Sequence, residues 1–146
     1  MNIYLDNCCY NRPYDDQAML SVALEAKCKL HIQELIRQNK YTLVGSYMLR
    51  YECSQNPYTM RKEAIMDFLQ DNVGIYVGNE RKAEIEKRAR EIMQSGIKFK
   101  DACHVASAIY AGCEYFISTD KRLLKFKTNE IRMVTPIEFV AETEEE

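Results

Sequence analysis

The sequence has no long apolar run, no recognisable export signal and no cysteine pair with the spacing of a zinc site. Its longest uncharged apolar stretch within a helical pattern, Val105–Cys113, is far shorter than the ~20 residues that a membrane-spanning helix needs. Residues 1–15 contain Asp6, Arg12 and Asp15 and lack the apolar centre of a signal peptide. These absences predict a soluble, cytoplasmic protein with no membrane segment.

Neither sign of charge dominates, because 20 basic residues stand against 22 acidic ones. Part of the negative charge is concentrated at the C-terminal end, so the rest of the chain is mildly basic. This balance excludes a histone-like polycation but permits a nucleic-acid partner. The length of 146 residues is typical of one domain, and no linker or internal repeat interrupts it. We therefore expect a single domain over residues 1–141 and an acidic tail over residues 142–146.

The six cysteines are expected to be reduced thiols, because the sequence shows no export signal. Cys8 and Cys9 are adjacent, and in an extended segment their side chains would diverge. Such a pair is poorly suited to bind one zinc ion together. We expect both to pack as small apolar side chains.

Short β-like runs alternate with longer helical patterns along the chain. The predicted strands are residues 2–5, 41–44, 73–77, 115–117 and 131–134. The predicted helices are residues 17–38, 46–52, 58–70, 80–94 and 101–111, with a helical turn at 121–125 and a last helix from 136. This alternation predicts an α/β fold in which helices cover both faces of a parallel sheet. Ligands of such sheets bind at the carboxyl ends of the strands, where the strand order reverses.

Four acidic residues from four separate predicted elements should meet at that edge. They are Asp6 after the first strand, Glu52 in the helix after the second, Asp101 at the start of the helix before the fourth, and Asp120 after the fourth strand. Taken singly, each could be an ordinary turn, cap or solvated residue, so the prediction depends on their joint placement. Clustered carboxylates raise one another's pKa unless a cation binds. Oxygen ligands suit Mg²⁺ or Mn²⁺, which polarise a phosphodiester and stabilise its leaving oxygen. All four are therefore predicted to be metal-binding, catalytic residues of a nuclease.

Three segments of the chain, "NIYLD", "LRYE" and "DACHVASAIYAGCEYFISTD", resemble the PIN-domain family, in particular its VapC-like branch of toxin–antitoxin ribonucleases. The resemblance covers about residues 2–138 and is most specific over residues 101–120. It implies a three-layer PIN-like fold whose parallel five-stranded sheet has the order 3-2-1-4-5. It also implies an endoribonuclease toxin that depends on Mg²⁺ or Mn²⁺, has RNA as its substrate, binds an antitoxin protein and forms homodimers, as many relatives do.

The same resemblance assigns supporting roles to Ser118 and Asn7. Ser118 supplies the hydroxyl of an S/T-x-D motif, and Asn7 stands where many relatives have Thr or Ser. Three cations, Arg12, Lys100 and Arg122, lie near the predicted edge and are candidates for binding RNA phosphates.

His104 follows Asp101 by one helical turn, and we expect it to form structural hydrogen bonds or to pack rather than to act as a general base. A receiver-type phospho-acceptor domain is excluded, because the third strand ends in Val77-Gly78-Asn79 without an acceptor Asp. The alternative function that remains is a catalytically weak PIN-like module that binds RNA or protein.

Overall fold

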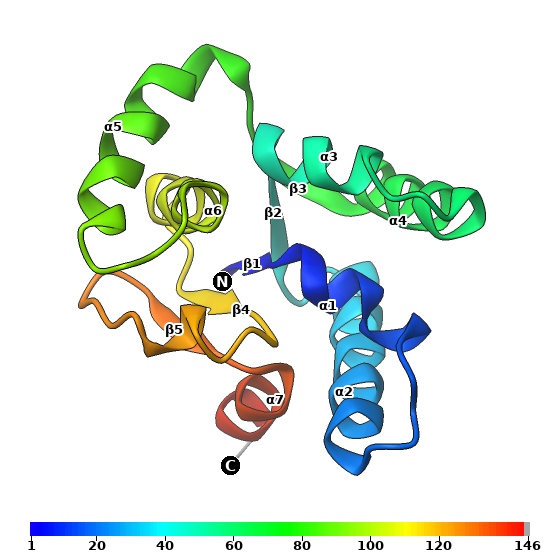
Figure 1. Ribbon diagram of the computed structural model, residues 1–146. Helices are drawn as coiled ribbons and strands as arrows, with labels where there is room; N and C mark the ends of the chain where they lie inside the picture. Colours follow the sequence, from blue (N-terminus) through cyan, green and yellow to red (C-terminus); the bar gives the residue numbers. More distant parts are fainter. Residues whose placement is uncertain (145–146) are drawn as a thin grey trace.

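A parallel five-stranded sheet forms the centre of the computed structural model, which describes residues 1–144 (Figure 1). Its strands are β1 (Asn2–Leu5), β2 (Thr42–Ser46), β3 (Val73–Val77), β4 (Tyr115–Ile117) and β5 (Arg132–Val134). They lie side by side in the order β3-β2-β1-β4-β5, with every neighbouring pair parallel. This order confirms the predicted fold class and places β1 beside β4 at the point of reversal.

Helices cover both faces of the sheet. They are α1 (Asn7–Asn11), α2 (Leu20–Arg37), α3 (Tyr47–Ser54), α4 (Thr59–Asn72), α5 (Lys82–Met93), α6 (Phe99–Tyr110) and α7 (Pro136–Glu144), with short 3-10 helices at Arg12–Tyr14, Asn79–Arg81 and Leu123–Lys125. The α5–α6 pair packs on one side, and α2 with α7 packs on the other (Figure 1). The three layers of the predicted architecture are therefore present.

The central strands are apolar because both of their faces are covered. Ile3, Tyr4 and Leu5 of β1 are fully buried, and the ring of Tyr4 stacks on that of Phe116 in β4 at a centroid distance of 5.3 Å. Burial on both sides explains why these strands appear in the sequence as continuous apolar runs rather than as alternating patterns. The same burial fixes the pairing register of the strands, and the register sets the positions of the residues that follow each strand.

Two segments differ from their predicted structure. Cys8 and Cys9 were expected in an extended segment, but residues 7–11 form the short helix α1, whose N-terminus is capped by Asp6. The long helix was predicted from residue 17 and begins at Leu20 instead, with no side-chain cap at Met19. Other boundaries agree closely: Ser46 caps α3 as its sequence position indicated, and Gly112 has a φ of 72° just after α6.

The last helix runs into the C-terminal acids. Helix α7 continues to Glu144, so the predicted tail is helical over residues 142–144, and Glu142 forms an ion pair with Arg132. Glu145 and Glu146 lie outside the described residues. Within residues 1–144, no helix is long and apolar enough to cross a membrane.

Candidate active site

The carboxylate of Asp6, directly after β1, is held by its neighbour Asn7 and by Ser118, which directly follows β4. One oxygen, Oδ1, accepts the backbone N–H of Asn7 at 2.8 Å, and the other, Oδ2, accepts the hydroxyl of Ser118 at 2.9 Å. The parallel pairing of Leu5 with Ile117 brings these residues together, because the next residue on each strand is Asp6 and Ser118. The side chain is almost completely buried, with 6% of its surface exposed. Its orientation is therefore fixed by the fold.

Ser118 also connects Asp6 to Asp120. While its hydroxyl donates to Asp6, its oxygen accepts the backbone N–H of Asp120 at 3.0 Å. The side chain of Asp120 caps the turn that follows it, since its Oδ1 accepts the backbone N–H groups of Arg122 and Leu123 at 3.0 and 3.3 Å. One hydroxyl thus fixes two of the predicted acids relative to each other.

Asp101 lies in the first turn of α6, and the other three acids influence its pKa. Burial and then the negative charges of Asp6, Asp120 and Glu52 raise its pKa from 3.8 to about 6, while His104 acts in the opposite direction. The other three acids therefore lie close enough to Asp101 to disfavour its negative charge. We refer to Asp6, Glu52, Asp101 and Asp120 as the acidic cluster.

Glu52, the fourth member of the cluster, is bound to His104. The Nε2 atom of His104 contacts Glu52 Oε1, while its Nδ1 lies 2.6 Å from the hydroxyl of Tyr4. The Tyr4 hydroxyl is in turn 2.7 Å from Ser46 Oγ, which caps α3 by accepting the N–H of Leu49. We call this series, Glu52–His104–Tyr4–Ser46, the buried hydrogen-bond chain. The expected structural hydrogen bonding of His104 is thus observed.

The pKa values of Glu52 and His104 are shifted in opposite directions by their contact. Burial raises the pKa of Glu52, but the hydrogen bond and charge of His104 and the charge of Lys100 outweigh burial and lower it. Burial lowers the pKa of His104, but its hydrogen bond to Glu52 and the surrounding carboxylate charges outweigh burial and raise it. Both shifts favour the ion pair of a carboxylate with an imidazolium.

The acidic cluster has suitable atoms for a divalent ion but does not form a closed ligand shell. Its oxygen donors are those that Mg²⁺ and Mn²⁺ prefer, and their mutual repulsion is what a cation would relieve. Within the part of the chain that the structure describes, however, no three His, Cys, Asp or Glu side chains come together closely enough to hold a metal ion. Glu52 is engaged with His104, and Asp6 and Asp120 each accept hydrogen bonds from neighbouring residues.

Cys8 belongs to this site, which the sequence did not indicate. Its Sγ lies 3.5 Å from Asp6 Oδ2 and 3.3 Å from Ser118 Oγ, and it accepts the backbone N–H of Thr119 at 3.3 Å. Cys9 is fully buried, as expected, and its Sγ also donates to the carbonyl oxygen of Ile117 at 3.3 Å, whereas Cys8 is only partly buried and contacts polar groups of the site. The two thiols point in different directions because residues 7–11 form a helix. All six cysteines are free, as predicted.

We predict that Cys8→Ala lowers the free energy of unfolding by about 1 kcal/mol, because the N–H of Thr119 loses its acceptor. Cys8→Ser should recover most of this loss, since a hydroxyl also accepts. Cys28→Ala, which removes a half-buried thiol on α2, is the control and should cost less. Urea unfolding of the three variants tests this, and equal losses in Cys8→Ala and Cys28→Ala would contradict it.

The remaining predicted residues occupy different surroundings. Asn7 Oδ1 accepts from Asn11 Nδ2 at 3.2 Å and from Cys53 Sγ at 3.4 Å, which ties α1 to α3. Arg12 is paired with Glu25 at 2.8 Å and with Asp15 at 3.2 Å, so its charge is balanced within the protein.

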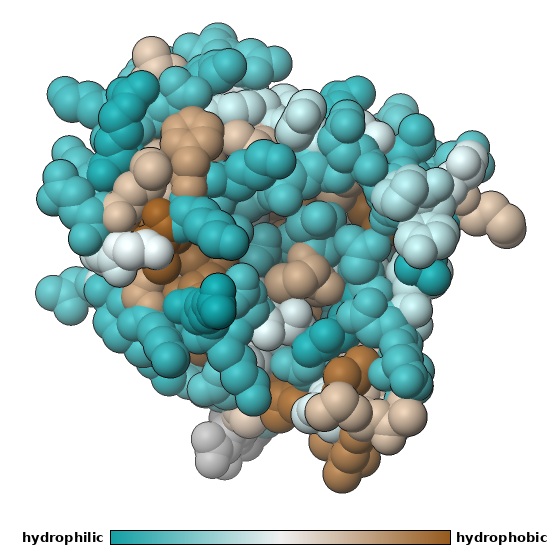
Figure 2. Space-filling model, viewed as in Figure 1, coloured by the Kyte–Doolittle hydropathy of each residue, from teal (hydrophilic) through white to brown (hydrophobic). Residues whose placement is uncertain are grey.

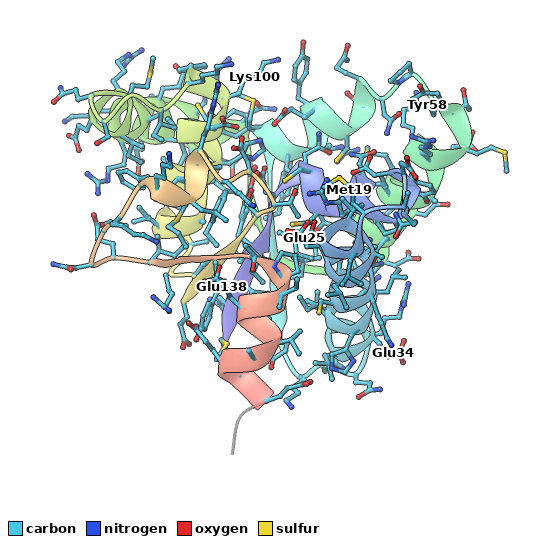
Figure 3. All side chains as sticks on the ribbon, turned by 60° about the horizontal axis from the view of Figure 1, so that its bottom comes forward. Met19, Glu25, Glu34, Tyr58, Lys100 and Glu138 are labelled. Atoms are coloured by element: carbon cyan, nitrogen blue, oxygen red, sulfur yellow. The ribbon has the colours of Figure 1, made fainter. Side chains whose placement is uncertain are left out.

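The other two predicted cations lie nearer the acidic cluster. Lys100 Nζ lies 5.5 Å from the centre of the Tyr51 ring, and Figure 3 shows Lys100 projecting at one edge of the molecule, far from the inward-facing Glu25 of α2. Arg122 lines a cavity together with Asp101 and Asp120. Arg122 therefore shares a cavity with two of the predicted acids.

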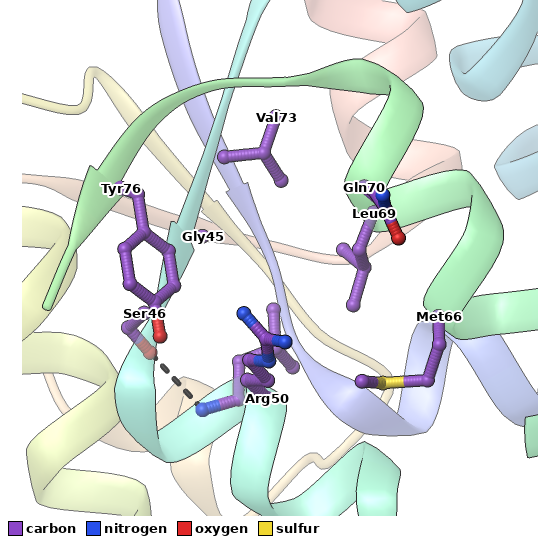
Figure 4. A pocket seen from close by; sticks show the side chains of 9 residues that line it. Gly45, Ser46, Arg50, Met66, Leu69, Gln70, Val73 and Tyr76 are labelled. Carbon is purple, nitrogen blue, oxygen red and sulfur yellow. Dashed lines mark hydrogen bonds between the residues drawn. The ribbon is translucent and has the colours of Figure 1, made fainter.

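A separate cavity of about 400 Å³ lies between α3, α4 and β3 (Figure 4). Arg50, Met66 and Tyr76 are among its lining side chains, and so is Ser46, the last member of the buried hydrogen-bond chain. No acid of the acidic cluster lines it. The cavity that contains cluster residues is the one beside Asp101 and Asp120, with a volume of about 440 Å³.

Two solved structures resemble this chain along almost their full length. VapBC2 from Rickettsia felis, solved bound to a DNA fragment from its promoter, has a TM-score of 0.55 and 13% identity, covering 91% of this chain and 97% of that chain. FitAcB from Neisseria gonorrhoeae has a TM-score of 0.55 and 17% identity, covering 92% and 98%. The fold is shared. No protein-family model and no curated protein sequence matches this chain.

Proposed function

We propose that this chain is a divalent-metal-dependent endoribonuclease of the VapC-like PIN type. The observation that supports it most directly is the placement of four carboxylates, from four separate elements, near the carboxyl edge of a parallel sheet. Their closeness is evident in Asp101, whose pKa burial and the other three acids raise to about 6. The fold shared with VapBC2 and FitAcB and the resemblance of residues 101–120 to the family motif support the same function.

Asp6, Asp101 and Asp120 would hold a Mg²⁺ or Mn²⁺ ion, and Glu52 would complete the set directly or through water. The bound ion would neutralise the phosphodiester and lower the pKa of a water molecule near it. Ser118 and the backbone of Asn7 keep the Asp6 carboxylate in one orientation, as groups behind a metal ligand usually do. Because no three such side chains among residues 1–144 are close enough to hold an ion, binding would require the carboxylates to move toward it.

RNA cleavage in the presence and absence of divalent ions tests the proposal. The wild-type protein is expected to cut members of a panel of tRNA, rRNA fragments and single-stranded oligomers with Mg²⁺ or Mn²⁺, and to cut none with EDTA. Asp6→Asn should reduce cleavage by about a hundredfold or more, because loss of a second-shell group alone typically costs ten- to a hundredfold. Absence of cleavage together with absence of saturable Mn²⁺ binding in calorimetry would contradict the proposal.

A catalytically weak RNA-binding or protein-interaction module is the second candidate. One observation favours it: among residues 1–144 no three potential ligands converge on a metal position, and Glu52 is held by His104. Such a module would bind RNA with and without divalent ions and show no turnover. Saturable Mn²⁺ binding that depends on Asp6 separates the nuclease from this alternative.

We propose further that the nuclease is the toxin of a toxin–antitoxin pair and binds an antitoxin protein. The fold shared with VapBC2, which was solved bound to promoter DNA, supports this assignment. Three exposed apolar side chains, Met19, Leu20 and Leu24, gather at the N-terminal end of α2, where Figure 2 shows an apolar area at the lower right. Exposed apolar patches commonly mark protein interfaces, and a homodimer is the alternative partner for this one.

A further inference from the structure

We propose that the cavity beside Asp101 and Asp120 binds one nucleotide of single-stranded RNA, next to the phosphodiester that is cleaved. The proposal rests on the proposed nuclease function and adds to it a position and a conformational class of substrate. It depends on the composition of one cavity, which combines acids, unpaired cations and apolar side chains.

The cavity lies between the loop that precedes α6 and the segment that follows β4. Its volume is about 440 Å³, within the range of roughly 300–1,000 Å³ that small-molecule sites occupy. Two members of the acidic cluster line it, Asp101 and Asp120. Its other lining residues include Ile97, Lys98, Arg122, Leu123, Lys125, Phe126 and Lys127. A ligand in this cavity would therefore touch the proposed catalytic edge.

The four cations of the cavity are not neutralised by the protein. Lys98, Arg122, Lys125 and Lys127 are exposed, and within residues 1–144 none of them forms an ion pair. In contrast, Arg12 is paired with a carboxylate elsewhere in the fold. The lining also carries two acids, Asp101 and Asp120, so the basic side chains outnumber the acidic ones. This excess of positive charge favours a ligand that carries phosphate, since phosphate contacts provide most of the affinity for nucleic acids.

The apolar part of the cavity favours a base. Phe126 is half-buried and lines the cavity together with Ile97 and the buried Leu123. Stacking on an aromatic ring accepts any base, because every base has a π-face. A base paired in a duplex could not enter the cavity, so the proposed substrate is single-stranded where it contacts the enzyme.

Fluorescence anisotropy with a short fluorescein-labelled oligouridine tests the site. The measurement is made in EDTA, so that it reports binding independently of cleavage. Lys125→Ala/Lys127→Ala should weaken binding about tenfold or more, and should reduce the slope of log K against log salt by more than about 0.7. Lys27→Ala/Lys40→Ala, which removes two exposed lysines of α2 and the turn after it, is the matched control and should change neither value.

Phe126 is tested with two variants, because it also packs against the core. Phe126→Leu should weaken single-strand binding about fivefold or more, whereas Phe126→Trp should retain it, since the larger ring still stacks. The wild-type protein should bind the single strand more tightly than the same strand annealed to oligoadenine. Thermal unfolding of both variants shows whether each is folded.

Three results would overturn the proposal: no binding by the wild-type protein, equal affinity of the two double-lysine variants, or equal affinity for single strand and duplex. Failure of the nuclease function gives a different pattern. In that case the single strand binds and the cavity variants weaken it, but no RNA is cut when Mg²⁺ or Mn²⁺ replaces EDTA. If RNA is cut but none of the cavity variants changes its binding, the proposed nuclease function stands and the proposed role of the cavity in binding RNA is wrong.

Discussion

Asp101→Asn is expected to abolish RNA cleavage and, at the same time, to stabilise the metal-free protein at neutral pH. Burial and then the charges of the other three acids raise the pKa of Asp101 from 3.8 to about 6. The charged form is therefore disfavoured in the folded protein at pH 7. Asparagine keeps the shape of the side chain and removes the charge, so the repulsion disappears together with a proposed metal ligand.

The pH dependence of this gain follows from the sign of the shift. Since the folded pKa lies above the unfolded one, the stability linked to this group is fully present below pH 3.8 and is lost as the pH rises through about 6. The variant should thus match the wild type near pH 4 and exceed it above pH 7. Asp101 is partly exposed, so solvent screening limits the expected gain to about 1 kcal/mol.

Urea unfolding in EDTA between pH 4 and pH 8 measures this gain, and cleavage of the RNA panel measures the loss of activity. Mn²⁺ should stabilise the wild-type protein and have a much smaller effect on the variant. Asp67→Asn, which removes an exposed acid on α4, is the control and should leave both properties unchanged. If Asp101→Asn cleaves RNA as fast as the wild type, Asp101 is not part of the catalytic site. If the variant is less stable by the same amount at every pH, the expected repulsion between Asp101 and the other three acids is contradicted.

The fold was predictable because its signals are local and repeated. Alternating apolar runs and helical patterns gave every strand to within a residue or two, and the parallel sheet then placed the strand ends, with Asp6 and Asp120, at one edge. Helix α1 was missed because a five-residue helix is too short to show periodicity. Its cap is the Asp6 side chain, which was also predicted to bind the metal.

The contacts within the site were less predictable, because they join residues that are far apart in sequence. Cys8 of α1 meets Ser118, which follows β4, and His104 of α6 meets Glu52 of α3. Tyr4 has the sequence character of a core residue, and its hydroxyl nevertheless links His104 to the cap of α3. Such pairings depend on side-chain directions at atomic precision, which hydrophobic pattern and helix propensity do not specify.

The second large effect is expected at His104, the centre of the buried hydrogen-bond chain. His104→Ala should lower the free energy of unfolding by about 2–4 kcal/mol, because it leaves a cavity and deprives the Tyr4 hydroxyl and Glu52 of a partner. His104→Gln should recover part of this loss, since an amide can still donate to Glu52.

The pH dependence again distinguishes the hydrogen-bonded pair from simple packing. The pKa of His104 is raised in the fold, so its contribution is fully present below about pH 6.5 and is lost as the pH rises through the folded value. The pKa of Glu52 is lowered, so its contribution is present above its unfolded value and is lost as the pH falls through the folded one. The wild-type protein should therefore show its largest advantage over His104→Gln between about pH 4.5 and pH 6.5.

The chain has a second histidine, which serves as the internal control. His31 is exposed on α2 and pairs with Glu144 at the surface, so His31→Ala should cost less than about 0.5 kcal/mol. Urea unfolding across pH 4–8 compares the variants directly. A loss in His104→Ala no larger than that in His31→Ala would contradict the buried chain. A large loss without pH dependence would mean that His104 acts by filling space, and that Glu52 is free to join the other three carboxylates around a cation.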